Sequence, residues 1–284
     1  MAREQIDWNR LWQENQVRPP GEEQLNFWDD FASHFRKKVE DGQVDPYVEL
    51  FYEYSELQPK ETIFDMGCAS GTLAIPYALR GHEIWAADFS SEMLKFLMIG
   101  AEEAGVADRI HPVRLDWNED WSKREDLPTC DVAISSRSFM PWDLSKGIRD
   151  LESVCSKRVC VGAWDTPSNG YDREIASYIG YERPGFGCYG YIMNELMERD
   201  MFPRLRFIKS PFRLSKYDSK EQALEAVTGA FQYGLTKEQE NMIAEYCEEH
   251  LLLHEEEDRC FWRFDHSEMS TMAHIMWEVR TQRR

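Results

Sequence analysis

Short apolar runs alternate with amphipathic stretches through the middle of the chain. The run Ile63–Phe64 ends at Asp65, and residues 73–79 then have the length and pattern of a helix. A continuous apolar run follows Cys130, which is typical of a strand buried in a parallel sheet. This alternation predicts an α/β fold built from strand–helix–strand units. The predicted strands cover residues 63–65, 82–88, 109–115, 130–138, 158–164, 205–209 and 272–280.

Two capping boxes mark helices in the last quarter of the chain. Ser219-x-x-Gln222 and Thr236-x-x-Gln239 each place a hydroxyl at the helix start and an amide three residues later. The second helix is strongly acidic and is expected to run to Asp258.

Two histidines fall within this acidic helix. His250 and His254 are four residues apart, so they would share one helix face and could hold a metal ion together. The sequence positions no third ligand. A solvated acidic helix is therefore the favoured interpretation, and no metal is expected.

Two segments outside the predicted sheet are rich in aromatic residues. Residues 7–57 carry ten of them, and Trp8 and Trp12 lie one helical turn apart, so we expect helices that pack on the core. Residues 165–203 are rich in Tyr and Gly and are longer than a plain connection. Such a segment predicts a cap or lid over a site.

The composition narrows the choice of partners and compartment. A formal net charge of −19 repels phosphate backbones, so nucleic acid is not an expected partner. No apolar run approaches the roughly 20 residues of a membrane span, and the N-terminus lacks the apolar segment of a secretion signal. The seven cysteines include no Cys-x-x-Cys pair, which favours a reducing environment. We therefore expect a cytoplasmic protein without a membrane partner.

The turn after the first predicted strand has the character of a ligand loop. Gly67 and Gly71 give the backbone freedom for a sharp turn, and the following helix offers unpaired N–H groups at its start. The second predicted strand ends at Asp88, which lies 88 − 65 = 23 residues after Asp65. An acid at about this separation reaches a ribose hydroxyl in dinucleotide-binding folds. Binding of a nucleoside is the leading hypothesis.

The loop residues discriminate between nucleosides. A nicotinamide fingerprint would place glycines at the positions of Ala69 and Thr72. The run from Ile63 to Thr72 instead resembles the first motif of the class I S-adenosylmethionine-dependent methyltransferases, with Ala69 in place of a usual glycine. The run from Asp88 to Leu94 is similar to the second motif of the same superfamily. The resemblance covers residues 60–165 well and the rest in outline.

This resemblance implies a fold, a domain organisation and a cofactor. The fold would be a Rossmann-like, seven-stranded, mostly parallel sheet flanked by helices, with the last strand antiparallel. An N-terminal helical cap over 1–57 would precede a methyltransferase domain over 58–284, with a lid insertion at about 165–203. The cofactor would be S-adenosyl-L-methionine. In the superfamily the acid at Asp88 holds the ribose, the acid at Asp116 accepts from the adenine amino group, and Trp117 lies near the ring. The implied cofactor residues are Asp65, Gly67, Cys68, Ala69, Gly71, Asp88, Phe89, Ser90, Met93, Asp116, Trp117 and Ser135.

The acceptor site is expected where the fourth and fifth strands end, because ligands of open α/β sheets bind at the carboxyl ends of strands. Arg137 could bind an anionic group of the acceptor or pair with Asp143, and the sequence leaves both open. Residues 28–32 resemble the helix that covers the cofactor in many small-molecule methyltransferases. The candidate acceptor residues are Trp28, Arg137, Trp142, Tyr171 and Tyr189.

The predicted function is methyl transfer to a small-molecule acceptor by in-line displacement at the sulfonium methyl group. Positioning of donor and acceptor supplies much of the rate in such a reaction, and no general base is identifiable in the sequence. A protein that binds S-adenosylmethionine without catalysis, and a nicotinamide-dependent oxidoreductase, are the alternatives. The sequence predicts neither the acceptor nor the oligomeric state.

Overall fold

The computed structural model describes residues 6–15, 46–164, 173–181, 187–211, 216–231, 234–256, 259–266 and 269–280. The chain divides into two compact units. The larger unit comprises residues 1–163, 188–208 and 273–284, and the smaller comprises 164–187 and 209–272. Trp28 and Tyr171 lie outside the described residues.

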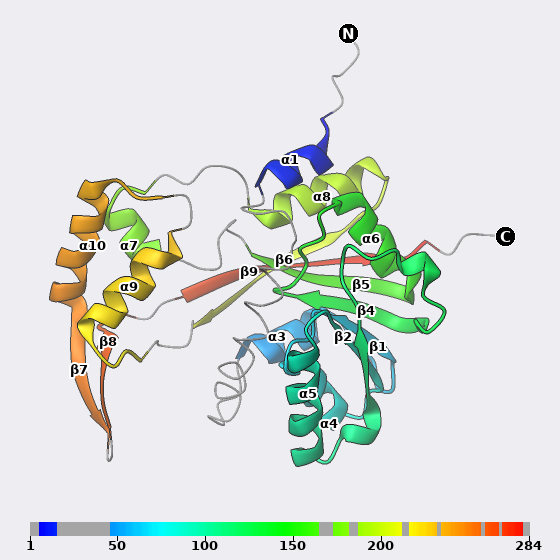
Figure 1. Ribbon diagram of the computed structural model, residues 1–284. Helices are drawn as coiled ribbons and strands as arrows, with labels where there is room; N and C mark the ends of the chain where they lie inside the picture. The colour runs from blue at the N-terminus through cyan, green and yellow to red at the C-terminus, as the bar shows by residue number, and fades with distance from the viewer. Residues whose placement is uncertain are drawn as a thin grey trace, which may run out of the picture. The chain divides into compact units, whose positions relative to one another are not determined.

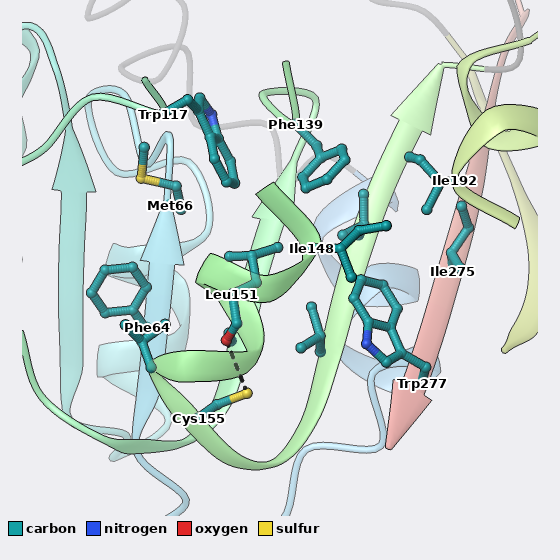
Figure 2. Close-up of a cluster of buried hydrophobic side chains, with 14 of the residues drawn as sticks. Phe64, Met66, Trp117, Phe139, Ile148, Leu151, Cys155, Ile192, Ile275 and Trp277 are labelled. Atoms are coloured by element: carbon teal, nitrogen blue, oxygen red, sulfur yellow. Dashed lines mark hydrogen bonds between the residues drawn. The ribbon is translucent and has the colours of Figure 1, made fainter. Parts of the chain in front are cut away.

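A seven-stranded sheet with the order β3-β2-β1-β4-β5-β9-β6 organises the larger unit. Neighbours pair in parallel from β3 through β5. Figure 2 shows β9, in red, running opposite to β5. The predicted doubly wound, mostly parallel sheet is therefore confirmed. Its strands are β1 (Ile63–Met66), β2 (Ile84–Asp88), β3 (Ile110–Arg114), β4 (Cys130–Ser136), β5 (Cys155–Trp164), β6 (Arg204–Pro211) and β9 (Met269–Glu278).

Helices cover both faces of this sheet (Figure 1). One face holds α1 (Trp8–Asn15), α6 (Leu144–Ser153) and α8 (Cys188–Glu198), and the other holds α3 (Pro46–Tyr54), α4 (Ala74–Leu79) and α5 (Ser91–Glu103). Two short 3₁₀ helices, η1 (Ala107–Arg109) and η2 (Trp121–Lys123), lie before and after β3.

The core beneath α6 shows why the sheet is stable. Phe64 of β1, Ile148 and Leu151 of α6 and Trp277 of β9 are all almost completely buried in one cluster, with the two α6 residues between Phe64 and Trp277 (Figure 2). Each such side chain stabilises the fold by about 1.5–3 kcal/mol. Helix α1 joins the same core through Trp12, whose indole Nε1 donates a 2.7 Å hydrogen bond to the carbonyl of Pro141.

A buried ion pair joins the end of α3 to β5, at the end of the central strands opposite to the ligand loop. The guanidinium of Arg158 donates to both carboxylate oxygens of Glu61 and to the carbonyls of Ser55 and Glu56. Burial alone would raise the pKa of Glu61. The hydrogen bonds that its carboxylate accepts, chiefly from Arg158, outweigh burial and lower this pKa to about 2.

The smaller unit has a core of its own. Its elements are α7 (Arg173–Tyr178), α9 (Lys220–Ala230), α10 (Lys237–His250) and the antiparallel pair β7 (Leu251–Glu256) and β8 (Arg259–Phe264). Ile175 of α7, Val227 of α9 and Ile243 of α10 pack together in this core with Phe264 of β8. Both helices begin where the capping boxes predicted, with Ser219 and Thr236 accepting from the backbone N–H groups three residues later. The reciprocal bond of a capping box is formed at Thr236, whereas the Gln222 side chain accepts from the N–H of Asp218, one residue before the cap.

The prediction that the acidic helix runs to Asp258 is wrong. Helix α10 ends at His250, and the chain continues as β7, in which Leu253 pairs with Trp262 of β8. The apolar residues of β8 provide a partner strand that the acidic pattern after His250 did not indicate. His254 therefore does not share a helix face with His250 and stacks on Phe261 instead.

Among the described residues, no helix is long and apolar enough to cross a membrane, and no group of three or more metal-binding side chains could hold an ion. The cap over 1–57 and the lid over 165–203 stay predictions, since much of both ranges lies outside the described residues.

Candidate functional site

The loop after β1 adopts the backbone conformation that its small residues allow. Gly67 has a φ of 77°, Ala69 of 47° and Gly71 of 95°, all in the left-handed region. The N–H groups of Gly67 and Cys68 both donate to the carbonyl of Ala87 at the end of β2, at 2.7 and 3.0 Å. Ala69 thus adopts a left-handed conformation that favours glycine, at a cost of about 1–2 kcal/mol.

Ser138, just beyond β4, braces this loop from the other side. Its hydroxyl donates to the carbonyl of Met66 at 2.9 Å and lies 3.0 Å from the hydroxyl of Ser135. A Cβ atom added to Gly67 would stand only 2.3 Å from the Cβ of Ser138. The position of Gly67 therefore requires glycine for space as well as for its backbone angle.

Asp88 holds the loop through hydrogen bonds to the backbone. Its carboxylate accepts from the N–H of Ala69 at 2.9 Å and from the N–H of Ser90 at 3.0 Å. The side chain is only 5% exposed. The residue predicted to hold a ribose thus also sets the shape of the loop that would surround the ligand.

Asp65 lies at the end of β1 with an unsatisfied carboxyl group. The residue is 2% exposed, and its Oδ2 has no hydrogen-bond partner among the described residues. Burial, and secondly the charge of Asp88, raise the pKa of Asp65 to about 7. The buried hydroxyl of Ser70 in the same loop is also without a partner in the described part of the chain. Buried polar groups normally find partners, so these atoms fit a ligand that brings a cationic donor to the loop.

Two further cofactor candidates, Cys68 and Ser90, are buried. Burial raises the pKa of the Cys68 thiol well above its usual range, and the charges of Asp88 and Asp65 add to this effect, so the thiol stays protonated. Ser90 caps α5 by accepting a 3.1 Å hydrogen bond from the N–H of Met93. Phe89 is half-buried between Asp88 and this cap.

The candidates after β3 divide between surface and core. The Asp116 carboxylate accepts from the N–H and the side-chain amide of Asn118, at 2.7 and 3.0 Å. The indole of Trp117 is buried, stacks on Trp121 with centroids 5.5 Å apart, and donates to the carbonyl of Ser138 at 2.8 Å. One face of Trp117 therefore belongs to the core, beside Phe139 (Figure 2).

Arg137 occupies a strained position at the end of β4. Its φ of 61° is left-handed, and its N–H donates to the carbonyl of Gly162 in β5 at 2.8 Å. The guanidinium carbon lies 4.5 Å above the ring centroid of Tyr47. Asp143, the alternative partner, caps α6 by accepting from the N–H of Lys146 at 2.8 Å, and no ion pair joins it to Arg137 among the described residues.

The other described acceptor candidates, Trp142 and Tyr189, each contact a different neighbour. The backbone N–H of Trp142 donates to the side-chain oxygen of Asn118, and the ring of Tyr189 packs edge-on against Phe207 at 5.4 Å. In the described part of the chain neither Trp142 nor Tyr189 makes a hydrogen bond or ring contact with Arg137.

Two residues that contact the carboxyl end of β4 and the ligand loop, Tyr47 and Ser138, were not predicted from the sequence as site residues. Tyr47 lies 89 residues before Ser136, yet their hydroxyl oxygens are 2.6 Å apart. For Ser138 the sequence predicted only a place in the strand over residues 130–138. No local pattern identifies either residue, because each acts through a partner that is distant in the sequence.

Comparison with known proteins gives a fold but no close functional relative. No protein-family model matches the chain. An uncharacterized protein of Haemophilus influenzae is 28% identical over 205 residues, which cover 72% of this chain and 75% of that protein. A Bacillus halodurans C-125 protein, provisionally named a methyltransferase, has a TM-score of 0.50 at 13% identity over 82% of this chain and 99% of its own. The YcgJ protein of Bacillus subtilis also has a TM-score of 0.50, at 11% identity over 82% and 98% of the two chains.

These structural likenesses, together with the strand order, define the class of fold. The chain has the Rossmann-like, seven-stranded fold of the class I S-adenosylmethionine-dependent methyltransferases. The resemblance noted over residues 60–165 is confirmed at the level of the fold.

Proposed function

We propose that this protein transfers a methyl group from S-adenosylmethionine to a small-molecule acceptor. The observation behind the proposal is the buried carboxyl group of Asp65, whose Oδ2 has no hydrogen-bond partner among the described residues. It lies at the start of a loop with left-handed backbone angles, and Asp88 bonds the N–H of Ala69 in that loop. The provisional name of the Bacillus halodurans neighbour supports the same activity. A nicotinamide cofactor fits less well, because its pyrophosphate would bring negative charge next to two acids.

The residues at the carboxyl ends of the strands suit the parts of this cofactor. Asp65 would accept from the amino group of the methionyl moiety, and Asp88 would hold the ribose while it fixes the loop. Asp116 and the backbone beside Trp117 would receive the adenine. Gly67 leaves the space that the loop needs for a close approach of the ligand.

The chemistry of transfer belongs to the cofactor, whose positive sulfur is a built-in leaving group for the methyl carbon. The protein has to align the acceptor with that carbon and keep water out, and alignment alone can lower the barrier by about 7–11 kcal/mol. The backbone hydrogen bonds of Gly67, Cys68 and Ala69 hold the loop rigid enough for this task.

The proposal includes a reducing, cytoplasmic location. All seven cysteines are free thiols, and five of them are buried. The proposal also excludes nucleic acid as the acceptor, since the net charge of −19 opposes the electrostatic attraction on which such binding depends.

Calorimetry tests whether the protein binds S-adenosylmethionine. S-adenosylmethionine and S-adenosylhomocysteine should both titrate to one site per chain, whereas NAD should give no heat. Absence of binding for both sulfur nucleosides would refute the assignment.

A turnover assay tests whether the protein transfers the methyl group to an acceptor. The protein is incubated with labelled S-adenosylmethionine and a metabolite extract, and S-adenosylhomocysteine is measured. Formation of this product identifies an enzyme. Tight binding without turnover on any extract would instead identify a non-catalytic binding protein.

A further inference from the structure

One face of helix α1 is hydrogen-bonded to the segment that follows β4. Trp12 is 2% exposed, and its indole Nε1 donates to the carbonyl of Pro141 at 2.7 Å. Asn9 lies three residues earlier and so on the same face of the helix. Its side-chain oxygen accepts a 2.7 Å hydrogen bond from the N–H of Leu144, the first residue of α6. These two bonds hold both ends of residues 141–144.

The same segment contacts the ligand loop, residues 67–71, through Ser138. The hydroxyl of Ser138 donates to the carbonyl of Met66, directly before the loop, at 2.9 Å. A Cβ atom at Gly67 would stand 2.3 Å from the Cβ of Ser138, so the two backbones are in close approach. A displacement of Ser138 would therefore be passed on to the loop.

The segment also contacts a residue predicted to lie near the adenine. The indole Nε1 of Trp117 donates to the carbonyl of Ser138 at 2.8 Å, and its ring meets Phe139 edge-on at 5.1 Å. The ring of Phe139 in turn packs against Trp12, with centroids 6.1 Å apart. Figure 2 shows Trp117 and Phe139 at the same end of the strands as Met66. A continuous series of contacts thus runs from α1 to the ligand loop and to Trp117.

The position of α1 depends on its contacts with the rest of the larger unit. The helix has only eight residues, fewer than a helix needs to be stable alone in water. It lies against α6 and α8 (Figure 1). Loss of the Trp12 donor would leave the carbonyl of Pro141 without that partner in a buried place, which is costly. The docking of α1 and the geometry of residues 138–144 are therefore expected to be energetically coupled.

We propose that α1 is a positioning element of the cofactor site. Trp12 and Asn9 fix residues 138–144, and this segment sets the geometry of the ligand loop and thereby the affinity for S-adenosylmethionine. The identity of the ligand in this inference rests on the proposed methyl-transfer function. Trp12 and Asn9 are positioning residues that act through Ser138, not catalytic residues.

Hydrogen exchange of the ligand-free protein tests the positioning directly. The N–H groups of Gly67, Cys68 and Ala69 are all hydrogen-bonded, so their exchange rates report local opening of the loop. Trp12→Phe keeps an aromatic ring but removes the indole donor. It should raise the exchange rates of these three amides by about 2–30-fold, the range typical of residues that act through a network of contacts.

A matched control lies on the same helix. Trp8 is one turn before Trp12, and its Nε1 donates at 3.0 Å to the carboxylate of Glu198 in α8, not to the segment after β4. Trp8→Phe removes the same kind of donor and should leave loop exchange unchanged. Asn9→Ala should raise it, whereas Asn9→Asp keeps an acceptor for the N–H of Leu144 and should resemble wild type.

Calorimetry with S-adenosylmethionine then measures the effect on binding. Trp12→Phe and Asn9→Ala should each raise the Kd by about 2–30-fold, whereas Trp8→Phe and Asn9→Asp should bind like wild type. Thermal unfolding followed by circular dichroism shows which variants are folded at the temperature of the assay. A merely structural role of Trp12 would lower the Tm of its variant without a change in Kd. Asn9→Ala alters a half-buried side chain and carries the test if Trp12→Phe does not fold.

The outcomes separate this inference from the function on which it rests. Loop exchange equal to wild type in folded Trp12→Phe and Asn9→Ala would show that α1 does not position the loop. An unchanged Kd in both variants, with wild type binding the cofactor, would also overturn the inference. If loop exchange rises in both variants but wild type binds no S-adenosylmethionine, the proposed function fails, while the positioning of the loop by α1 stands.

Discussion

The buried Asp65 carboxyl group makes a quantitative prediction about stability and pH. Its pKa is about 7 in the folded chain, against an ordinary value of 3.8. A raised carboxyl pKa means that the folded state binds a proton more tightly than the unfolded state. The corresponding stability is fully present below about pH 4 and is lost as the pH rises through about 7.

The magnitude follows from the two pKa values. Their difference, about 3 units, is worth about 4 kcal/mol over the full range. Between about pH 5 and about pH 8, the part that titrates is about 3 kcal/mol. Asp65→Asn cannot ionise, so this part of the pH dependence should be missing from the variant. The variant should gain stability relative to wild type as the pH rises.

Denaturant unfolding of the cofactor-free protein provides the assay. Unfolding free energies are measured at several pH values for wild type, for Asp65→Asn and for Asp108→Asn on the exposed turn η1. The difference between wild type and Asp65→Asn should change by about 3 kcal/mol across the range, whereas the Asp108 control should follow wild type. Parallel curves for wild type and Asp65→Asn would refute the buried, proton-binding carboxyl group.

The same carboxyl group links cofactor binding to proton release. A cationic amino group placed beside Asp65 would favour its ionised form and lower its pKa. Binding of S-adenosylmethionine near neutral pH should then release a proton in wild type but not in Asp65→Asn. Calorimetry in two buffers of different ionisation enthalpy measures that proton, and equal heats in both buffers for wild type would contradict the link.

Three further predictions concern the loop and the ion pair. Asp88→Ala should weaken S-adenosylmethionine binding by about 1.5–3 kcal/mol in calorimetry, the scale of a charge-assisted hydrogen bond, and unchanged affinity would contradict the assignment. Gly67→Ala should abolish cofactor binding because of its contact with Ser138, and Ser138→Gly in the same chain should restore part of it; no recovery would show that backbone strain alone is responsible. Glu61→Gln should cost about 3–5 kcal/mol of unfolding free energy at neutral pH because it leaves Arg158 buried and unpaired. Since the pKa of Glu61 is lowered to about 2, the wild-type contribution is present above its ordinary value of 4.5 and is lost as the pH falls through about 2, so the variant and wild type should converge in acid.

The sequence allowed prediction of those parts of the fold that local patterns determine. The run from Ile63 through Gly71 carries its turn chemistry in consecutive residues, so strand, loop and helix could be predicted together. The capping boxes at Ser219 and Thr236 were equally local. The helix predicted beyond His250 failed because its conformation depends on pairing with β8, which a pattern within one segment does not report.

The features of the candidate site also divide into those that a local pattern predicts and those that depend on partners distant in the sequence. Asp88 could be predicted from its spacing, but its role in holding the Ala69 N–H depends on how the loop returns toward β2. The sequence left the partner of Arg137 open and did not predict that Asp143 caps α6 through the N–H of Lys146. Tyr47 could not be predicted, because only the packing of α3 beside β4 and β5 brings it under Arg137.

Residues 135–138, at the end of β4 and just beyond it, contact both the ligand loop and α3. Ser135 and Ser138 contact each other, and Ser138 fixes the cofactor loop through the Met66 carbonyl. Between them, Ser136 holds Tyr47 and Arg137 stacks on it. Because both sets of contacts arise from one short segment, the predicted cofactor residue Ser135 and the predicted acceptor residue Arg137 are held by the same stretch of backbone. In-line methyl transfer needs this kind of alignment, since a misplacement of about 1 Å can cost roughly 100-fold in rate.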